Sequence, residues 1–305
     1  MSEGTGFQFT DDAVPRAYDE VLVPRLFEPW ALLLLDDCNL RPNAVVLDVA
    51  TGPGSVARLA AKRIGPGGRV VATDISRPML DVANSKKPSS PDSAPITYIE
   101  SPAAPLGVES AAFDFVVCQQ GLQFFPDRLA ALREMRRALK PEGQLAISAW
   151  SHIEDNDFYA ALHAALRESV PGDLADRLLA PFSWPDAQVL KNTMETAGFH
   201  EIRVRSATLP LIFEGGIAQG ARALAATPLA PSLATCRDAS QIEHRHRRAP
   251  CSTSQGGKGE RQNDLEYRQR AEVTTPQHLP IPLAMVHRLE VQPTLRHIDS
   301  HGAGP

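Results

Sequence analysis

An apolar run that ends abruptly in small residues constrains the fold of this chain more than any other feature. Residues 45–49 read Val-Val-Leu-Asp-Val, residues 50–54 read Ala-Thr-Gly-Pro-Gly, and residues 55–61 continue with helical spacing. This order predicts a buried strand, a tight loop and a helix N-terminus, where backbone can closely approach a ligand. Residues 69–73 predict a second strand that ends in Asp74, whose carboxylate is suited to both hydroxyls of a ribose. The two segments together predict a nucleoside-binding site.

Composition and charge bound the class of protein. The 305 residues are enough for one large core with an appended segment. A net charge of -5 and a pI near 6.0 argue against a nucleic-acid partner, which requires a basic face. No apolar run approaches the roughly 20 residues of a membrane span, and the acidic Met1–Gly4 segment does not resemble a signal peptide. The four cysteines lack a CxxC spacing and indicate reduced thiols. We therefore expect a soluble, cytoplasmic protein.

Strand-like and helix-like segments alternate through the first half of the chain. The predicted strands cover residues 45–49, 69–73, 96–100, 113–118 and 144–149. The predicted helices between them cover residues 55–64, 77–84 and 127–139. Repeated alternation of this kind indicates βαβ units, and hence a parallel sheet with helices on its faces. We therefore predict an α/β fold with a Rossmann-like, doubly wound and mostly parallel sheet.

Helical segments flank this predicted core on both sides. Residues 12–40 have helical spacing that is interrupted by Pro24 and Pro29. Beyond Trp150 the sequence predicts helices at 157–167, 185–197 and 218–226, and a long strand at 201–213. We expect an N-terminal helical lid at 1–40, a ligand-binding core at 41–150, a helical cap and returning strand of the same domain at 151–236, and a tail at 237–305.

The tail at 237–305 differs in character from the rest of the chain. It contains a single aromatic residue, Tyr267, and most of the nine histidines, and neither strand nor helix spacing persists in it. We predict that it is largely disordered or aberrant. A frameshift is one hypothesis for the abrupt change, and translation of the coding DNA in its other two frames tests it. The Glu-His-Arg-His run at 243–246 is not read as a metal site, because its arginines repel a cation and no second ligand cluster accompanies it.

Two kinds of ligand use a strand, a glycine-containing loop and a following acid. A dinucleotide site has the spacing G-x-G-x-x-G and binds a pyrophosphate at the helix N-terminus. Here Asp48 precedes Ala50, Gly52 and Gly54, and its carboxylate beside the helix start would repel a pyrophosphate. The same carboxylate suits an ammonium group, directly or through water. A ligand with adenosine at one end and a charged amino acid at the other fits this loop better, and S-adenosylmethionine is such a ligand.

Five segments in series resemble the class I S-adenosylmethionine-dependent methyltransferases, and particularly the ubiquinone/menaquinone-biosynthesis C-methyltransferase-like group. The resemblance covers about residues 7–235, and its segments are 17–19, 46–54, 72–80, 113–118 and 138–145. A single glycine loop is weak evidence, whereas five segments in this order and spacing are specific. The resemblance implies that the ligand binds at the carboxyl ends of the strands of an open sheet.

The resemblance also implies a set of cofactor-binding residues. The Gly52–Gly54 loop would pass under the methionine part of the cofactor, and Asp74 would hold the ribose. Ile75 and Met79 would flank the adenine, and Gln119 would line the sulfonium end. The full expected set is Asp48, Ala50, Gly52, Pro53, Gly54, Asp74, Ile75, Met79, Pro102, Ala103 and Gln119.

Two positions depart from the pattern of that family. Ala50 stands where a glycine is usual, which is tolerable if its φ is negative. Pro102 stands where the family usually places an acid or amide that bonds the adenine amino group, and proline has neither that acceptor nor an N–H. Loss of one such bond would cost roughly 0.5–1.5 kcal/mol, or about tenfold in affinity at most. The backbone of Ala103 would still meet the adenine edge.

No conspicuous catalytic constellation is expected in this kind of enzyme. Methyl transfer from a sulfonium is an in-line displacement in which the cofactor supplies the leaving group, so the protein aligns the acceptor and excludes water. The catalytic residues therefore stay open, with Tyr18, Gln120 and His152 as candidates and Gln119 and Gln123 as further polar residues near the acceptor. Plain packing is the alternative for Tyr18, and an exposed loop position is the alternative for His152.

These observations predict an S-adenosylmethionine-dependent methyltransferase that acts on a small organic acceptor, because residues 7–40 and 151–235 would wall an apolar pocket. A non-catalytic S-adenosylmethionine-binding protein is the alternative outside enzymes. An NAD-dependent dehydrogenase is the remaining alternative within them. The sequence leaves open the acceptor, the methylated atom (C, O or N) and the oligomeric state.

Overall fold

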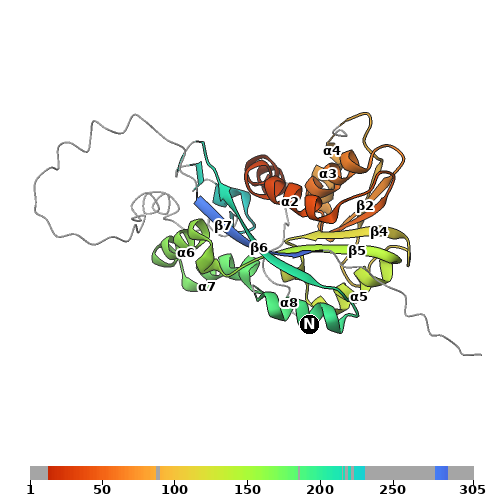
Figure 1. The fold of residues 1–305 in the computed structure, drawn as a ribbon. Coiled ribbons are helices and arrows are strands. Elements are labelled where there is room, and N and C mark those ends of the chain that lie inside the picture. The colour runs from red at the N-terminus through yellow and green to blue at the C-terminus, as the bar shows by residue number, and fades with distance from the viewer. Residues whose placement is uncertain are drawn as a thin grey trace, which may run out of the picture.

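A seven-stranded sheet forms the centre of the computed structural model (Figure 1). The structure describes residues 13–86, 90–184, 186–214, 216, 219–220, 223–230 and 279–287. The strands are β1 (Val45–Val49), β2 (Arg69–Asp74), β3 (Ile96–Glu100), β4 (Phe113–Gln119), β5 (Leu139–Trp150), β6 (Arg203–Leu211) and β7 (Leu279–His287). Their order across the sheet is β3-β2-β1-β4-β5-β7-β6.

The first five strands are parallel, and the central strands β1 and β4 are buried on both faces. β1 pairs with β2 and with β4, β2 pairs with β3, and β4 pairs with β5. Successive residues of a strand point to opposite faces. Val46 and Val117 therefore join the core on one face, whereas Leu47 and Val116 join the core on the other. The predicted α/β, doubly wound and mostly parallel sheet is confirmed.

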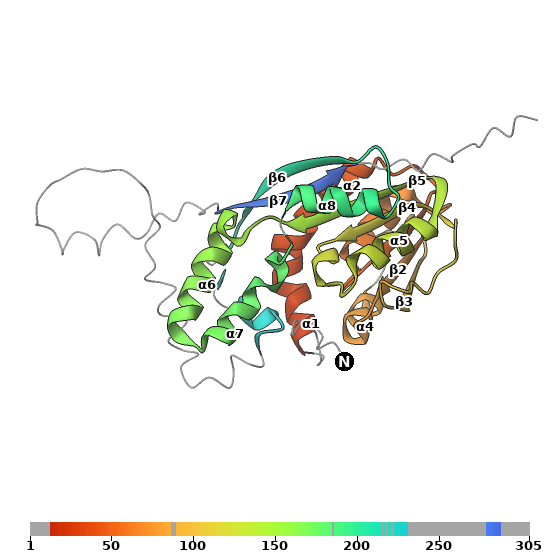
Figure 2. The same cartoon turned by 90° about the horizontal axis from the view of Figure 1, so that it is seen from below.

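Helices cover the two faces of the sheet. They are α2 (Glu28–Cys38) and α3 (Ser55–Ile64) on one face, and α5 (Arg128–Ala138) and α8 (Ala187–Thr196) on the other, whereas α4 (Arg77–Ser85) follows β2. Figure 2 shows α5 and α8 together along the sheet. The region predicted as a helical cap is therefore divided, because α8 packs its Leu190 and Met194 into the same core as α5.

The N-terminal helices form one continuous helical stretch, which corrects the expected interruptions at Pro24 and Pro29. α1 (Ala13–Ala17) leads into the π-helical segment η1 (Tyr18–Phe27), and α2 follows directly. Pro24 lies inside η1, where the wider bonding pattern of a π-helix accommodates a residue without an N–H. Pro29 lies at the first turn of α2, where a proline is tolerated. Residues 1–12 of the predicted lid lie outside the described residues.

The helices after β5, apart from α8, share a buried cluster with the N-terminal helices. They are η3 (Ile153–Asp155), α6 (Asp157–Ser169), α7 (Gly172–Asp176), η4 (Arg177–Phe182) and η5 (Ala223–Ala226). Leu162 of α6 and Phe182 of η4 belong to the same buried cluster as Leu26 and Trp30. These helices therefore share one core with the N-terminal helices. The helix predicted at 218–226 is reduced to η5 among the residues that are described there.

One strand of the sheet comes from the predicted tail, so the expectation of disorder is wrong for residues 279–287. β7 lies between β5 and β6 and pairs antiparallel with both. Its prolines and short apolar run carry no local strand signal, and the pairing is made with segments distant in sequence, which a local pattern does not reveal. The rest of the tail, residues 231–278 and 288–305, lies outside the described residues. The structure therefore does not test the frameshift hypothesis there.

β5 begins earlier than the sequence predicts. Phe113 of β4 pairs with Leu139, whereas Phe115 pairs with Gln144, so residues 140–143 form an irregularity in the register. α5 correspondingly ends at Ala138. The remainder of β5 reaches Trp150 at the carboxyl edge of the sheet, where β1, β2 and β4 also end.

Candidate active site

The loop after β1 combines three residues with left-handed backbone. Ala50 has a φ of 58°, Gly52 of 56° and Gly54 of 80°. The negative φ on which tolerance of Ala50 was made conditional is therefore not found, and a non-glycine residue in this region carries strain of the kind found at functional sites. The Ala50 methyl fits because residue 121 is a glycine, since a Cβ on Gly121 would lie 2.7 Å from the Ala50 Cβ.

The two glycines of the loop meet different surroundings. A Cβ on Gly54 would lie 2.7 Å from the Tyr98 Oη and 3.1 Å from Arg58 Nη1, so this position has no room for a side chain. A Cβ on Gly52 would have no atom of the described structure within 4 Å. The loop is thus closed behind Gly54 and open at Gly52, where a ligand can approach the backbone.

Asp74 at the end of β2 is bonded to this loop. Its Oδ2 accepts a hydrogen bond of 2.8 Å from the backbone N–H of Gly52, and its Oδ1 accepts one of 2.8 Å from the N–H of Ser76. Burial raises the pKa of Asp74, whereas these backbone bonds lower it. The N–H of Ile75 also contributes a bond, and a carboxylate with about four acceptor sites keeps capacity for a further partner. The expected pairing of the glycine loop with a ribose-binding acid is therefore geometrically possible.

Asp48 is buried directly beneath the loop, with 1% of its surface exposed. Its Oδ2 accepts a hydrogen bond of 2.5 Å from the Thr51 hydroxyl, and its Oδ1 has no partner among the described residues. Burial raises the pKa of Asp48 to about 7, and the Asp74 carboxylate contributes to the rise. An unpaired oxygen of this kind fits the ammonium end of S-adenosylmethionine, directly or through water.

The expected adenine-binding residues lie partly on the surface. Ile75 is 67% exposed, whereas Met79 is buried and so forms the base of this area rather than its surface. Pro102 is exposed and Ala103 is half-buried. Ser101 fixes the loop, because its N–H donates to the Asp74 carbonyl and its Oγ accepts from the N–H of Gly107. Pro53 lies in the loop itself, where its carbonyl accepts from Arg58 Nη1 at 2.7 Å.

Three glutamines lie at or just after the end of β4, at positions 119, 120 and 123. Gln119 Nε2 donates a hydrogen bond of 2.8 Å to the Phe27 carbonyl, which ties β4 to the N-terminal helices. Gln120 is 6% exposed with a φ of 48°, and Gln123 is 2% exposed. The side-chain amides of Gln120 and Gln123 have no hydrogen-bond partner among the described residues.

Tyr18 lies near the expected ribose acid. The Tyr18 ring stacks on Phe27 with a centroid distance of 4.8 Å. Burial raises the pKa of Tyr18, and the neighbouring Tyr159 and Asp74 add to the rise, so these groups lie around its hydroxyl. His152 has an exposed side chain, and its carbonyl accepts a 2.7 Å bond from the Asn156 amide. The structure thus brings Tyr18 and Gln120 to the carboxyl edge and leaves His152 in an exposed loop.

An aromatic wall, which sequence spacing did not reveal, continues from Tyr18. We use this name for Tyr18, Phe27, Trp150, Tyr159 and Phe182. Trp150 is central to it, with centroid distances of 6.4 Å to Phe27, 6.3 Å to Tyr159 and 6.2 Å to Phe182. The residues come from η1, β5, α6 and η4, so only the tertiary structure assembles them. Of its members, Tyr18 is the one that the sequence analysis placed near the acceptor.

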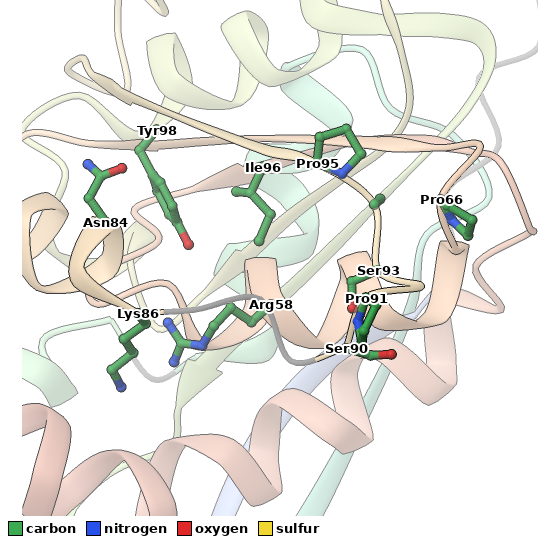
Figure 3. A pocket seen from close by; sticks show the side chains of 11 residues that line it. Arg58, Pro66, Asn84, Lys86, Ser90, Pro91, Ser93, Pro95, Ile96 and Tyr98 are labelled. Carbon is green, nitrogen blue, oxygen red and sulfur yellow. The ribbon is translucent and has the colours of Figure 1, made fainter.

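A separate pocket lies on the side of α3 and β3 (Figure 3). Its lining includes Arg58, Lys86 and Tyr98 and none of the residues expected to bind the cofactor. Arg58 and Tyr98, together with Ala83, close the space behind Gly54. The Lys86 ammonium forms an ion pair with Asp19 of η1. The side chains of this pocket therefore pack behind the glycine loop, and the pocket is distinct from the expected cofactor site.

The described part of the chain shows neither a metal cluster nor a membrane-spanning helix. In that part of the chain, no cluster of three or more His, Cys, Asp or Glu side chains is arranged to hold a metal ion. None of the helices described there has the length and apolar character that crossing a bilayer requires.

Comparisons with known proteins agree with this geometry. A family model for a methyltransferase domain matches residues 47–147. The demethylmenaquinone methyltransferase of Staphylococcus aureus (strain JH9) is 31% identical over 199 residues, which cover 62% of this chain and 79% of that protein.

Two solved structures share the fold. The phosphoethanolamine N-methyltransferase 2 of Haemonchus contortus, in complex with S-adenosyl-L-methionine, has a TM-score of 0.54 and 17% identity, and the match covers 93% of this chain and 57% of that one. The YcgJ protein of Bacillus subtilis has a TM-score of 0.51 and 15% identity, over 86% of this chain and 98% of that one.

The fold and the family match define a class I S-adenosylmethionine-dependent methyltransferase, and S-adenosylmethionine is its cofactor. The chain belongs to the menaquinone/ubiquinone-like group of that class, which includes the demethylmenaquinone methyltransferases. The expected enzyme class is confirmed, and the dehydrogenase and non-catalytic alternatives are set aside.

Proposed function

We propose that this enzyme methylates a small, flat and largely apolar ring acceptor, similar to the demethylmenaquinone for which its relative is named. The aromatic wall is the observation that carries the proposal. It begins at Tyr18, beside Asp74, and continues through Trp150 to Phe182. Aromatic side chains bind a flat ring by offset or edge contacts at such distances and exclude water around it.

The roles of the site residues follow from their contacts. When bound, S-adenosylmethionine supplies the methyl group and the leaving sulfur. The open backbone at Gly52 and the acids Asp48 and Asp74 suit its amino-acid and ribose parts. Tyr18 keeps its proton at neutral pH because its pKa is raised, so it suits a hydrogen-bond donor rather than a base. His152 is too exposed in this structure to support a role as base.

The finer expectations on partners and location belong to the same proposal. The net charge of -5 supports a small-molecule acceptor rather than nucleic acid. Cys38 and Cys118 are buried free thiols, which supports a reducing compartment such as the cytoplasm.

Label transfer from the cofactor tests the proposal. The protein is incubated with S-adenosylmethionine tritiated in the methyl group and with chemically reduced 1,4-naphthoquinone, a ring without a side chain. Phosphoethanolamine serves as an acceptor without a ring. We expect tritium in the naphthoquinol product only, and its mass and NMR spectrum identify the methylated atom. Label in phosphoethanolamine alone, or in neither compound while S-adenosylhomocysteine binds, would contradict the proposed acceptor.

A further inference from the structure

Two buried side-chain amides lie close together in sequence without a partner. Gln120 is 6% exposed and Gln123 is 2% exposed. The oxygen and nitrogen atoms of both amides lack a hydrogen bond among the described residues. Buried polar groups are almost always paired, because an unpaired one costs free energy that folding does not recover. Two such amides in four residues therefore require a partner that is not part of this chain's described structure.

Gln120 is fixed beside the cofactor loop. It directly follows β4, and its backbone N–H donates a hydrogen bond of 2.8 Å to the Ser148 carbonyl in β5. Its φ of 48° is rare for a residue with a side chain. The next residue, Gly121, is the one that packs against Ala50 of the loop. The strained backbone therefore fixes residue 120 beside the cofactor loop, and its side-chain amide is buried and unpaired among the described residues.

Gln123 is fixed beside the aromatic wall. It lies in the short helix η2 (Leu122–Phe124). Its carbonyl accepts a hydrogen bond of 2.8 Å from Arg128 Nη2 and one of 3.4 Å from the Ser183 hydroxyl, next to Phe182 of the wall. The backbone carbonyl of Gln123 therefore has partners within the protein, whereas its side-chain amide has none among the described residues.

We propose that Gln120 and Gln123 determine specificity by hydrogen bonding to carbonyl or hydroxyl oxygens on the ring acceptor. This inference rests on the proposed function. A glutamine amide offers both a donor and an acceptor, so it pairs with either kind of oxygen. An acceptor without such oxygens leaves the amides unpaired in a dry site, which is how a polar pocket rejects an apolar analogue. The aromatic wall then recognises the ring, and the two amides recognise its oxygens.

Three ring compounds that differ only in oxygen content test the proposal. The compounds are reduced 1,4-naphthoquinone, 1-naphthol and naphthalene. Quenching of tryptophan fluorescence measures their binding to the full-length protein in the presence of S-adenosylhomocysteine, under an atmosphere free of O₂. We expect the wild-type protein to bind the two-oxygen ring at least tenfold more tightly than naphthalene, with 1-naphthol between them. In each of the variants Gln120→Met and Gln123→Met, we expect the affinity ratio of the two-oxygen ring to naphthalene to fall at least threefold. Methionine has a similar length to glutamine and no amide.

Stability separates recognition from an ordinary structural role. Because each substitution removes unpaired buried atoms, the melting temperature of both variants should equal or exceed that of the wild type. Gln188→Met is the matched control, since the Gln188 amide is exposed and donates a 2.7 Å bond to Asn192, and it should leave the ring preference unchanged. A lower melting temperature with an unchanged ring preference would identify the amides as structural and overturn the proposal.

The outcomes also separate this inference from the proposed function. If rings bind and accept label but both variants keep the full preference for oxygens, the amide assignment alone is wrong. If S-adenosylhomocysteine binds and none of the three rings does, the ring acceptor is wrong and the inference falls with it.

Discussion

Asp48 is buried beside a second acid, and its environment makes the stability of the protein depend on pH. Asp48 is 1% exposed and Asp74 lies close enough to raise its pKa further. The carboxyl of Asp48 has a pKa of about 7 in the folded protein, against an ordinary value of 3.8. The folded state therefore binds the proton more tightly than the unfolded state does. The contribution of this residue to stability is present below pH 4 and is lost as the pH rises toward 7.

Asp48→Asn should remove this dependence while keeping the bond from the Thr51 hydroxyl. We expect the free energy of unfolding of the wild type, relative to the variant, to fall between pH 4 and pH 7. At about 1.4 kcal/mol per pKa unit, the limit is about 4 kcal/mol. Urea unfolding at several pH values measures the difference. If the free energies of unfolding of the two proteins change with pH in parallel, the pKa of Asp48 is the same in the folded and the unfolded state.

The N-terminal helix η1 is tied to the core of the molecule at both of its ends. Asp19 near its start pairs with Lys86 after α4, and the carbonyl of Phe27 at its end accepts a bond from Gln119 of β4. The Asp19 side chain is 9% exposed and the Lys86 side chain is 31% exposed. The pair is therefore shielded from water more than an ordinary surface ion pair, and removal of one partner leaves a mostly buried charge.

Lys86→Met should loosen η1 without unfolding the sheet. We expect amide hydrogen exchange in residues 18–27 to accelerate about tenfold, which corresponds to about 1.4 kcal/mol. Arg77→Met removes the exposed ion pair with Asp81, which contributes less than about 0.5 kcal/mol, and is the matched control. Hydrogen exchange with mass spectrometry measures both variants. Equal exchange in the two would mean that the Asp19 pair does not hold the helix.

The sheet joins the two halves of the molecule through a strand that arrives from far along the chain. β7 pairs with residues 147–150 of β5 and with the whole of β6. It is the strand through which β6 is connected to the parallel part of the sheet. Without it, β6 loses its ladder partner and residues 147–150 of β5 lose the partner on the side away from β4. Trp150 of the aromatic wall lies at that end of β5.

A chain that ends at residue 278 should therefore be much less stable than one that ends at residue 290. We expect the shorter chain to aggregate or to melt more than about 10 °C lower, which corresponds to several kcal/mol for a protein of this size. The longer chain retains β7 and is the control for removal of the final residues. Thermal melts and size-exclusion chromatography compare the two. Equal stability would show that β7 contributes little to the sheet.

The sequence by itself determined the elements whose signals are local. β1, the glycine loop, α3 and β2 follow from residues close together in the chain, because strand and helix periodicity and loop glycines depend on neighbouring residues. The position of Asp74, the expected ribose-binding acid, follows as well, since it ends a strand next to β1 and its carboxylate accepts a bond from the Gly52 N–H. The cofactor and the class of enzyme were predictable for the same reason.

Only the tertiary structure decided the features that depend on distant segments. The left-handed backbone of Ala50 is possible because Gly121 leaves room for its methyl group, and no local pattern reports that contact. The aromatic wall and the unpaired amides of Gln120 and Gln123 exist only once β4, β5 and the flanking helices are packed together. β7 completes the sheet for the same reason, since a strand is stabilised by its neighbours and these lie far away in sequence.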